Sequence, residues 1–126
     1  YNLLGDQQGN QMIRELATLL KNALRHNDRV ARWLSGDEFL VFLHNADHHF
    51  AVQIGERLRA AVEEGSKDWP YPVTISVGVA TCPEDGVTGE ELLAKAEEAN
   101  NAAKLGGKNQ VCGANGCYRG PVRFQE

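Results

Sequence analysis

The sequence predicts an α+β domain in which helices pack on an antiparallel sheet. Three segments carry apolar residues at helical spacing, the segments between them carry the apolar or alternating runs typical of strands, and two of these strand candidates are separated by one short turn. The chain has 126 residues, of which 42% are hydrophobic and 24% are charged. This length and composition are those of one globular domain with its own core, so we expect a single domain over residues 1–126.

The first third of the chain predicts a helix followed by a β-hairpin. A helix is expected from Gln11 to Leu24, where apolar residues recur every three or four positions. These residues are Met12, Leu16, Leu19, Leu20 and Ala23. Strands are expected at Arg29–Trp33 and Phe39–Leu43 around the turn Leu34–Asp37, and the continuous apolar run of the second strand is typical of burial on both faces.

The middle of the chain predicts a second helix and the clearest strand. Asp47 to Glu64 has an apolar helical face, and Gly65 follows as a helix stop. The residues of that face are Phe50, Ile54, Leu58, Ala61 and Val62. The segment Val73–Val79 alternates apolar residues with small or polar ones, which predicts a strand over its whole length.

The last third predicts a third helix and a closing strand. Thr88 and Glu91 have the spacing of a capping box, in which each side chain bonds the backbone N–H of the other residue. The core residues of this helix are expected to be Leu92, Ala96, Ala99 and Ala103. Gly106–Gly107 is expected to end the helix, and a strand is expected at Gln110–Cys112.

The expected element order is therefore helix, strand, strand, helix, strand, helix, strand. One further strand before residue 1 would complete an order that contains the split β-α-β arrangement, so we expect the domain to be incomplete at its N-terminus. We expect residues 113–126 to be a C-terminal extension or linker.

Charge, hydropathy and cysteine content narrow the expected partners. The net charge is −4, whereas binders of nucleic acid and of membrane surfaces carry a basic excess, so we expect neither contact by this domain. No apolar run approaches the ~20 residues of a membrane helix, and we expect a cytoplasmic location, alone or as the cytosolic part of a larger protein. Three cysteines do not make a disulfide framework, so Cys112 and Cys117 are expected to be thiols that flank an Asn-Gly hairpin turn.

The strongest chemical signal lies at the tip of the predicted hairpin, in Ser35–Phe39. Asp37 and Glu38 are adjacent carboxylates, and Mg2+ (or Mn2+) prefers hard oxygen ligands of this kind beside nucleotide phosphates. A small residue such as Gly36 lets a bulky ligand approach the backbone. An acidic hairpin tip is also an ordinary solvated turn, so these residues alone leave both interpretations open.

Four motifs in order extend this signal over nearly the whole chain. Arg32–Phe39 resembles the signature hairpin of the GGDEF family, the bacterial diguanylate cyclase domains, and Gly5–Asn10 resembles the GHxxGD turn of that family. Val73–Ala80 is similar to its VTxSxGxA strand, and Ala102–Asn109 is similar to its AKxxGRN helix end. The resemblance implies a palm-like fold (nucleotidyl-cyclase or ferredoxin-like), in which helices pack on an antiparallel sheet.

The resemblance also implies a reaction and the residues that carry it. The family reaction condenses two GTP into cyclic di-GMP with release of two pyrophosphates, in a homodimer that uses Mg2+ or Mn2+. Asp37 and Glu38 would be its catalytic and metal-binding carboxylates. The implied GTP-binding residues are Asn10, Gly36, Lys104 and Lys108. The alternative for the two lysines is that they are cations placed favourably at the C-terminus of a helix dipole.

A second implied site binds the product and inhibits the enzyme. Arg25 and Asp28 match the RxxD motif of the family's inhibitory cyclic di-GMP site, and Arg32 would add a second guanidinium. A guanidinium can stack on a guanine, and a carboxylate can accept its N1–H and N2–H hydrogen bonds. The alternative is a polar turn that simply ends the first helix.

Departures from the family pattern support a second hypothesis. Tyr1 and Asn10 stand where the family has a guanine-reading Asn and Asp, Ser35 replaces a glycine, and Leu34 is one residue extra before the tip. The family's other metal aspartate lies on a strand before the first helix, and we identify no such strand here. The second hypothesis is a catalytically degenerate domain that binds cyclic di-GMP or GTP and regulates an adjacent sensor or phosphodiesterase domain.

Overall fold

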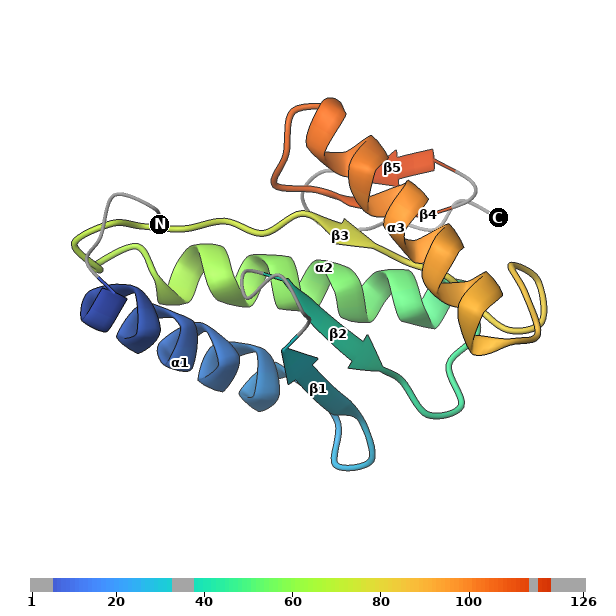
Figure 1. The fold of residues 1–126 in the computed structure, drawn as a ribbon, viewed down its shortest axis with the longest axis horizontal. Coiled ribbons are helices and arrows are strands. Elements are labelled where there is room, and N and C mark those ends of the chain that lie inside the picture. The colour runs from blue at the N-terminus through green and yellow to red at the C-terminus, as the bar shows by residue number, and fades with distance from the viewer. Residues whose placement is uncertain (1–5, 33–37, 114–115, 119–126) are drawn as a thin grey trace.

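The computed structural model describes residues 6–32, 38–113 and 116–118. Within these ranges it has three helices and five strands (Figure 1). The elements are α1 (Asp6–Ala23), β1 (Arg29–Arg32), β2 (Phe39–Phe42), α2 (His48–Gly65), β3 (Val77–Gly78), α3 (Gly89–Leu105), β4 (Val111–Gly113) and β5 (Gly116–Tyr118). The predicted α+β class and element order are confirmed, with β5 added. This strand lies in the range that we expected to be an extension or linker.

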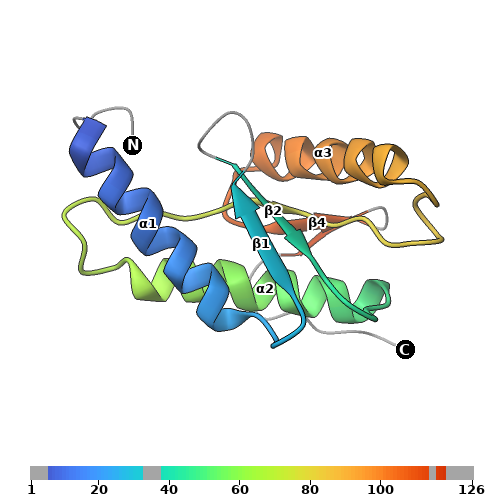
Figure 2. The same cartoon turned by 60° about the horizontal axis from the view of Figure 1, so that its bottom comes forward.

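The strands form two sheets instead of one. β1 and β2 make an antiparallel hairpin in which Val30 lies opposite Val41. β3, β4 and β5 make a second sheet, in which β3 and β4 are parallel and β4 and β5 are antiparallel. The parallel pair follows from the connection, because α3 carries the chain from the end of β3 back to the start of β4. α2 lies on one side of this sheet and α3 on the other (Figure 2).

The main core lies where α1, α2 and the hairpin meet. Its buried residues are Leu16, Leu20, Ile54, Leu58 and Val62. Alternate residues of the hairpin, among them Val30, Phe39 and Val41, pack against this cluster, as does Trp69. α1 begins at Asp6 and not at Gln11, because apolar periodicity marks only the buried face of a helix and the preceding residues are polar.

Two expectations about buried faces are wrong. β2 is not buried on both sides, since Phe42 is 59% exposed. Within the described residues, it is the face that carries Phe39 and Val41 that packs against the core formed with α1 and α2. Phe50 was expected in the core but is 37% exposed, and the guanidinium of Arg25 lies over its ring, 4.7 Å from the centroid.

The predicted strand at Val73–Val79 is also corrected. Within the described residues, only Val77 and Gly78 of this segment are paired, with Val111 and Cys112 of β4. The alternating pattern still describes which side chains point inward, since Val73 and Ile75 pack against the core. A strand assignment needs a hydrogen-bonded neighbour as well as a buried face.

The starts of α2 and α3 are as predicted. Asp47 caps α2 by accepting a hydrogen bond from the backbone N–H of Phe50. Thr88 and Glu91 form a complete capping box at the start of α3. Within α3, Ala99 and Ala103 are buried, whereas Leu92 and Ala96 are only partly buried.

The expectation of two thiols at the last hairpin is wrong. Cys112 and Cys117 are directly opposite in the β4–β5 register and form a disulfide. The predicted hairpin itself is present. Cys82 is a free, exposed cysteine. Among the helices described here, none combines the length and the apolar character required for crossing a membrane.

Candidate functional site

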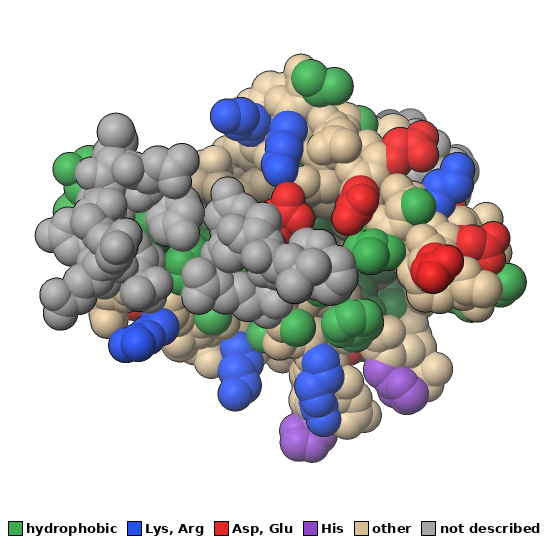
Figure 3. Space-filling view, in the orientation of Figure 1, with side chains coloured by type: hydrophobic (Ala, Val, Ile, Leu, Met, Phe, Trp, Pro, Cys, Tyr) green, Lys and Arg blue, Asp and Glu red, His purple; other side chains and the backbone are tan. Residues whose placement is uncertain are grey.

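The hairpin and the end of α3 meet at an ion pair. Glu38 immediately precedes β2, and its Oε1 atom lies 3.9 Å from the Nζ atom of Lys104 in the last turn of α3. The two side chains are 44% and 46% exposed, so solvent and ligands can reach both. Acidic and basic side chains lie next to one another on this face of the molecule (Figure 3). Two candidate site residues that are far apart in the sequence are therefore adjacent in space.

The local folding explains this meeting. Residue 38 stands at the end of the hairpin because Arg32 pairs with Phe39. α3 is held close to β3 because Gly78 has no side chain, and a Cβ there would overlap the carbonyl oxygen of Ala96. The Nδ2 atom of Asn100 donates to the carbonyl of Ser76 at 2.8 Å, which fixes the helix along the strand direction.

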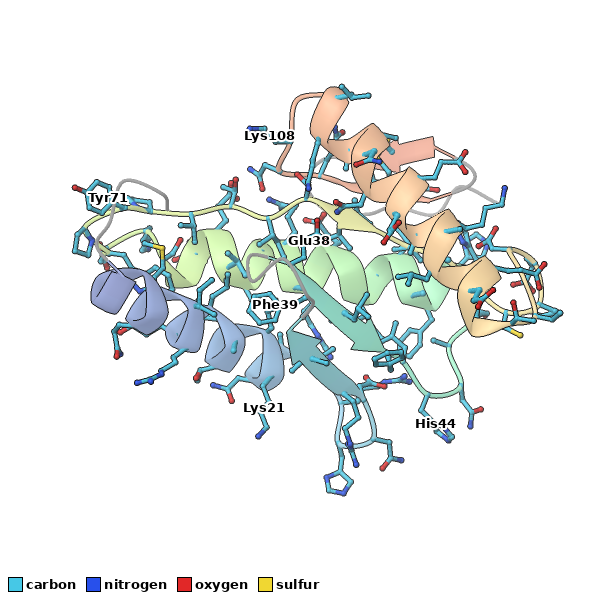
Figure 4. The ribbon with its side chains drawn as sticks, viewed as in Figure 1. Lys21, Glu38, Phe39, His44, Tyr71 and Lys108 are labelled. Carbon is cyan, nitrogen blue, oxygen red and sulfur yellow. A yellow bond between two sulfur atoms is a disulfide. The ribbon has the colours of Figure 1, made fainter. Side chains whose placement is uncertain are left out.

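Lys108 lies on the turn after α3, above Glu38 in the view of Figure 4. Its backbone N–H donates to the carbonyl of Ala103 at 2.9 Å, and its side chain is exposed. Lys108 and Asn109 have φ angles of 64° and 49°, in the left-handed region. Two consecutive residues other than glycine rarely adopt this conformation.

Four residues that the sequence interpretation missed as site residues hold this turn. Arg59 Nη1 donates to Asn109 Oδ1 at 2.9 Å, and Asn109 Nδ2 donates to Glu63 Oε2 at 2.6 Å. Arg59 also pairs with the buried Glu56. The hydrogen bond from Asn109 and the nearby Arg59 lower the pKa of Glu63. The helical spacing of Glu56, Arg59 and Glu63 could have indicated the ion pairs, but no local signal links them to Asn109.

Among the described residues, Glu38 has the donor chemistry for a divalent cation. Glu38 offers a half-exposed carboxylate, a hard oxygen ligand of the kind that Mg2+ takes. Asp37 and Gly36 lie outside the described residues. In the part of the chain that the structure describes, no group of three or more His, Cys, Asp or Glu residues could hold a metal ion. The donor chemistry of Glu38 therefore fits Mg2+ as one ligand of a site that needs further oxygens.

Arg25 and Asp28 form a second polar cluster between α1 and β1. Arg25 Nε and Nη2 donate to the Asp28 carboxylate at 2.7 and 2.8 Å, and the backbone N–H of His44 donates at 3.0 Å. These hydrogen bonds lower the pKa of Asp28 to about 2. The side-chain hydrogen bonds from Arg25 contribute most and the backbone N–H donors contribute less, whereas burial acts in the opposite direction. Asp28 in turn raises the pKa of Arg25.

The remaining predicted site residues are placed only through their backbones. Asn10 lies within α1, and Arg32 ends β1 opposite Phe39. Their side chains lie outside the described part of the chain. The structure thus brings Glu38 to Lys104 and Arg25 to Asp28, and it puts Lys108 on the turn that follows Lys104.

The chain is similar to known proteins over most of its length. Residues 1–110 match the family described as "Diguanylate cyclase, GGDEF domain". The chain is 33% identical over 110 residues to "Diguanylate cyclase A" of Treponema denticola, covering 85% of this chain and 29% of that protein. It is 34% identical over 110 residues to "Cyclic di-GMP phosphodiesterase NbdA" of Pseudomonas aeruginosa, covering 86% of this chain and 14% of that protein. It therefore spans less than a third of these curated relatives.

A solved structure shows the same fold. The EAL/GGDEF domain protein from M. capsulatus superimposes with a TM-score of 0.75 at 31% sequence identity, covering 86% of this chain and 72% of that one. The family match extends over all the elements that form the Glu38–Lys104 pair and the turn after α3. The chain belongs to the GGDEF family of diguanylate cyclase domains.

Proposed function

We propose that this domain binds GTP with a divalent cation between the hairpin tip and the end of α3, and that it condenses two GTP into cyclic di-GMP. The observation that carries the proposal is the Glu38–Lys104 pair, because it sets an oxygen ligand for a cation beside an ammonium group for a phosphate. Family membership supports the same assignment.

The electrostatics of the site match a metal–triphosphate. Glu38 and Asp37 would hold Mg2+ or Mn2+ together with phosphate oxygens and water. Such a cation neutralises phosphate charge when it is bound. Lys104 and Lys108 would contact the phosphates as point charges, which a lysine can do without a fixed orientation. Asn10 and Gly36 would lie against the nucleotide, as the family resemblance implies.

The reaction depends mainly on how the two GTP molecules are placed relative to each other. In each of two steps, the 3′-hydroxyl of one GTP would attack the α-phosphate of the other and release pyrophosphate. Holding both nucleotides in line replaces a bimolecular encounter by an effectively unimolecular step. Because each domain would hold one GTP, the reaction implies a homodimer. Glu38 would either assist the cation or accept the hydroxyl proton.

The test is turnover of GTP by the full-length protein that the gene encodes. The protein is first freed of bound product. We expect Mg2+-dependent formation of cyclic di-GMP and pyrophosphate, measured by chromatography. Glu38→Gln should lower turnover at least about a hundredfold, the effect of losing a proton-transfer or charge-stabilising group. No turnover by the wild type, or full turnover by Glu38→Gln, would contradict the proposal.

A matched control uses an exposed Glu–Lys pair elsewhere in the described part of the chain. Glu64 and Lys67 lie 2.6 Å apart at the end of α2 and are 74% and 59% exposed. Glu64→Gln makes the same chemical change as Glu38→Gln in a pair that we assign no role. We expect Glu64→Gln to turn over GTP at the wild-type rate.

The alternative proposal is cyclic di-GMP binding at Arg25, Asp28 and Arg32. The observation that favours it is the geometry of Arg25. Its guanidinium lies over the ring of Phe50, and 31% of the Arg25 side chain is exposed. A planar guanidinium held in this way can stack a guanine on its open side. The Asp28 carboxylate already accepts four hydrogen bonds, so its role would be to orient Arg25.

Calorimetry with cyclic di-GMP tests this alternative. We expect the wild type to bind and Arg25→Ala to bind at least about tenfold more weakly, the loss of roughly one stacked, charge-assisted contact. Arg29→Ala is the control, because Arg29 is a neighbouring exposed arginine that bonds only the carbonyls of His26 and Asp28 among the contacts described. Equal affinity for the wild type and Arg25→Ala, or no binding by either, would reject the alternative.

A further inference from the structure

The turn that carries Lys108 is held from α2, and we propose that Arg59 is a positioning residue for this turn, acting through Asn109. The inference rests on the proposed phosphate contact of Lys108. It adds a residue that touches neither nucleotide nor cation. Its role would be to keep the Lys108 ammonium where a phosphate can meet it.

The turn needs such support because its backbone is strained. Lys108 and Asn109 both have left-handed φ angles, at which an L side chain crowds the following carbonyl. Residues in this conformation persist only where the surrounding structure holds them. The backbone N–H of Lys108 bonds Ala103, which ties the turn to α3, but this bond leaves the Asn109 peptide unfixed.

Two segments of the chain, α2 and the residues just before β3, converge on Asn109 and supply that support. Arg59 Nη1 donates to its Oδ1 atom at 2.9 Å, and its Nδ2 atom donates to Glu63 at 2.6 Å. Its backbone N–H donates to the Oγ atom of Ser76 at 3.2 Å. Both the oxygen and the nitrogen of the amide are therefore engaged by residues of α2, while the segment before β3 holds the backbone.

Arg59 is itself built to hold one orientation. Only 8% of its side chain is exposed, and its Nε atom lies 3.0 Å from both carboxylate oxygens of Glu56, whose side chain is 11% exposed. A buried bidentate pair fixes the plane of a guanidinium. The remaining nitrogen, Nη1, points to Asn109 and Glu63. The buried pair thus transmits the position of α2 to the turn.

This arrangement predicts different behaviour for the two lysines. Lys104 belongs to α3, whose position is set by its own contacts to β3 and to Ser76 just before that strand. Lys108 depends on the turn. Loss of the Asn109 side chain should move Lys108 and leave Lys104 in place.

The first test is a thermodynamic cycle on Asn109→Gly. Glycine tolerates the left-handed backbone and removes only the side-chain contacts. We expect Asn109→Gly to bind GTPγS with Mg2+ about tenfold more weakly, the loss of one charge contact. Adding Asn109→Gly to Lys108→Met should weaken binding no further, whereas adding it to Lys104→Met should multiply the two effects. Additive effects with Lys108→Met, or wild-type affinity of Asn109→Gly, would overturn the proposal.

The second test concerns Arg59 itself and has a readout that needs no nucleotide. Removing Arg59 alone leaves Glu56 buried without a partner, so the variant is Glu56→Met/Arg59→Met, which replaces the pair by apolar side chains. We expect faster hydrogen exchange of the amides in residues 106–110 with exchange in the middle of α3 unchanged. Arg57→Met, at an exposed arginine of the same helix, is the control and should leave both unchanged.

The two tests separate the possible failures. If the wild type binds no nucleotide, the proposed function is wrong, and the exchange measurement still decides whether Arg59 holds the turn. If nucleotide binds but exchange and affinity in the Glu56→Met/Arg59→Met variant equal those of the wild type, the positioning role of Arg59 is wrong and the proposed function stands.

Discussion

Acidification of the protein should reveal the contribution of the buried Asp28 carboxylate to stability. This side chain has no exposed surface and accepts hydrogen bonds from Arg25 Nε and Nη2 and from the backbone N–H groups of Arg25 and His44. These donors hold the pKa of Asp28 at about 2, compared with the ordinary 3.8. The difference corresponds to about 2 kcal/mol of folding free energy at roughly 1.4 kcal/mol per pH unit.

The direction of the effect follows from the sign of this difference. Because the pKa is lower in the folded than in the unfolded chain, the stabilisation is complete well above pH 3.8 and is lost as the pH falls through 3.8 towards 2. Urea unfolding at about pH 6 and about pH 2 measures it. We expect the wild type to lose about 2 kcal/mol more than Asp28→Asn between these conditions, since the variant has no carboxylate to protonate.

A matched substitution at an exposed aspartate controls for the loss of stability that acid causes elsewhere in the protein. Asp68→Asn removes a carboxylate from the loop after α2, and we expect it to follow the wild-type profile. Parallel profiles for the wild type and Asp28→Asn would show that the Arg25 and His44 hydrogen bonds do not favour the charged form. The reasoning about this cluster would then be refuted.

Three further predictions concern packing, capping and the disulfide. Gly78→Ala should destabilise the domain by about 3 kcal/mol or more in urea, because its Cβ would overlap the Ala96 carbonyl, and a loss under about 1 kcal/mol would contradict that close approach. Thr88→Ala should cost about 1 kcal/mol through loss of the capping box with Glu91, and an unchanged thermal midpoint would speak against the cap. Reduction of the β4–β5 disulfide should cost about 2 kcal/mol by the chain-entropy relation for so short a loop, and equal unfolding midpoints with and without reductant would disprove it.

The sequence predicted best the features that depend on neighbouring residues. The capping box of Thr88 and Glu91 forms within one helical turn, so the spacing of its two residues along the chain was enough to predict it. The strand at Val73–Val79 was predicted too long because alternation reports which side chains are buried, whereas strand length depends on a partner elsewhere. The disulfide was missed because cysteine counts do not reveal register.

For the candidate site too, local features could be predicted from the sequence and long-range contacts could not. Periodicity placed Glu38 next to a strand and Lys104 at a helix end, but only the family resemblance predicted that they face each other. The link between Arg59 and Asn109 joins residues 50 positions apart, and it could not be read from either segment. Long-range hydrogen bonds of this kind depend on how α2 and α3 pack on the two faces of one sheet.

The looseness of the Glu38–Lys104 contact has a consequence for how a ligand enters. A half-exposed pair at 3.9 Å stabilises the free domain by about 1 kcal/mol at most, so separating it demands little energy. When a cation and an anion arrive together, the cation would take the place of Lys104 beside Glu38, and the anion would take the place of Glu38 beside Lys104. In the ligand-free domain the charges of Glu38 and Lys104 already offset each other, and binding would exchange this internal ion pair for contacts to an external cation and anion.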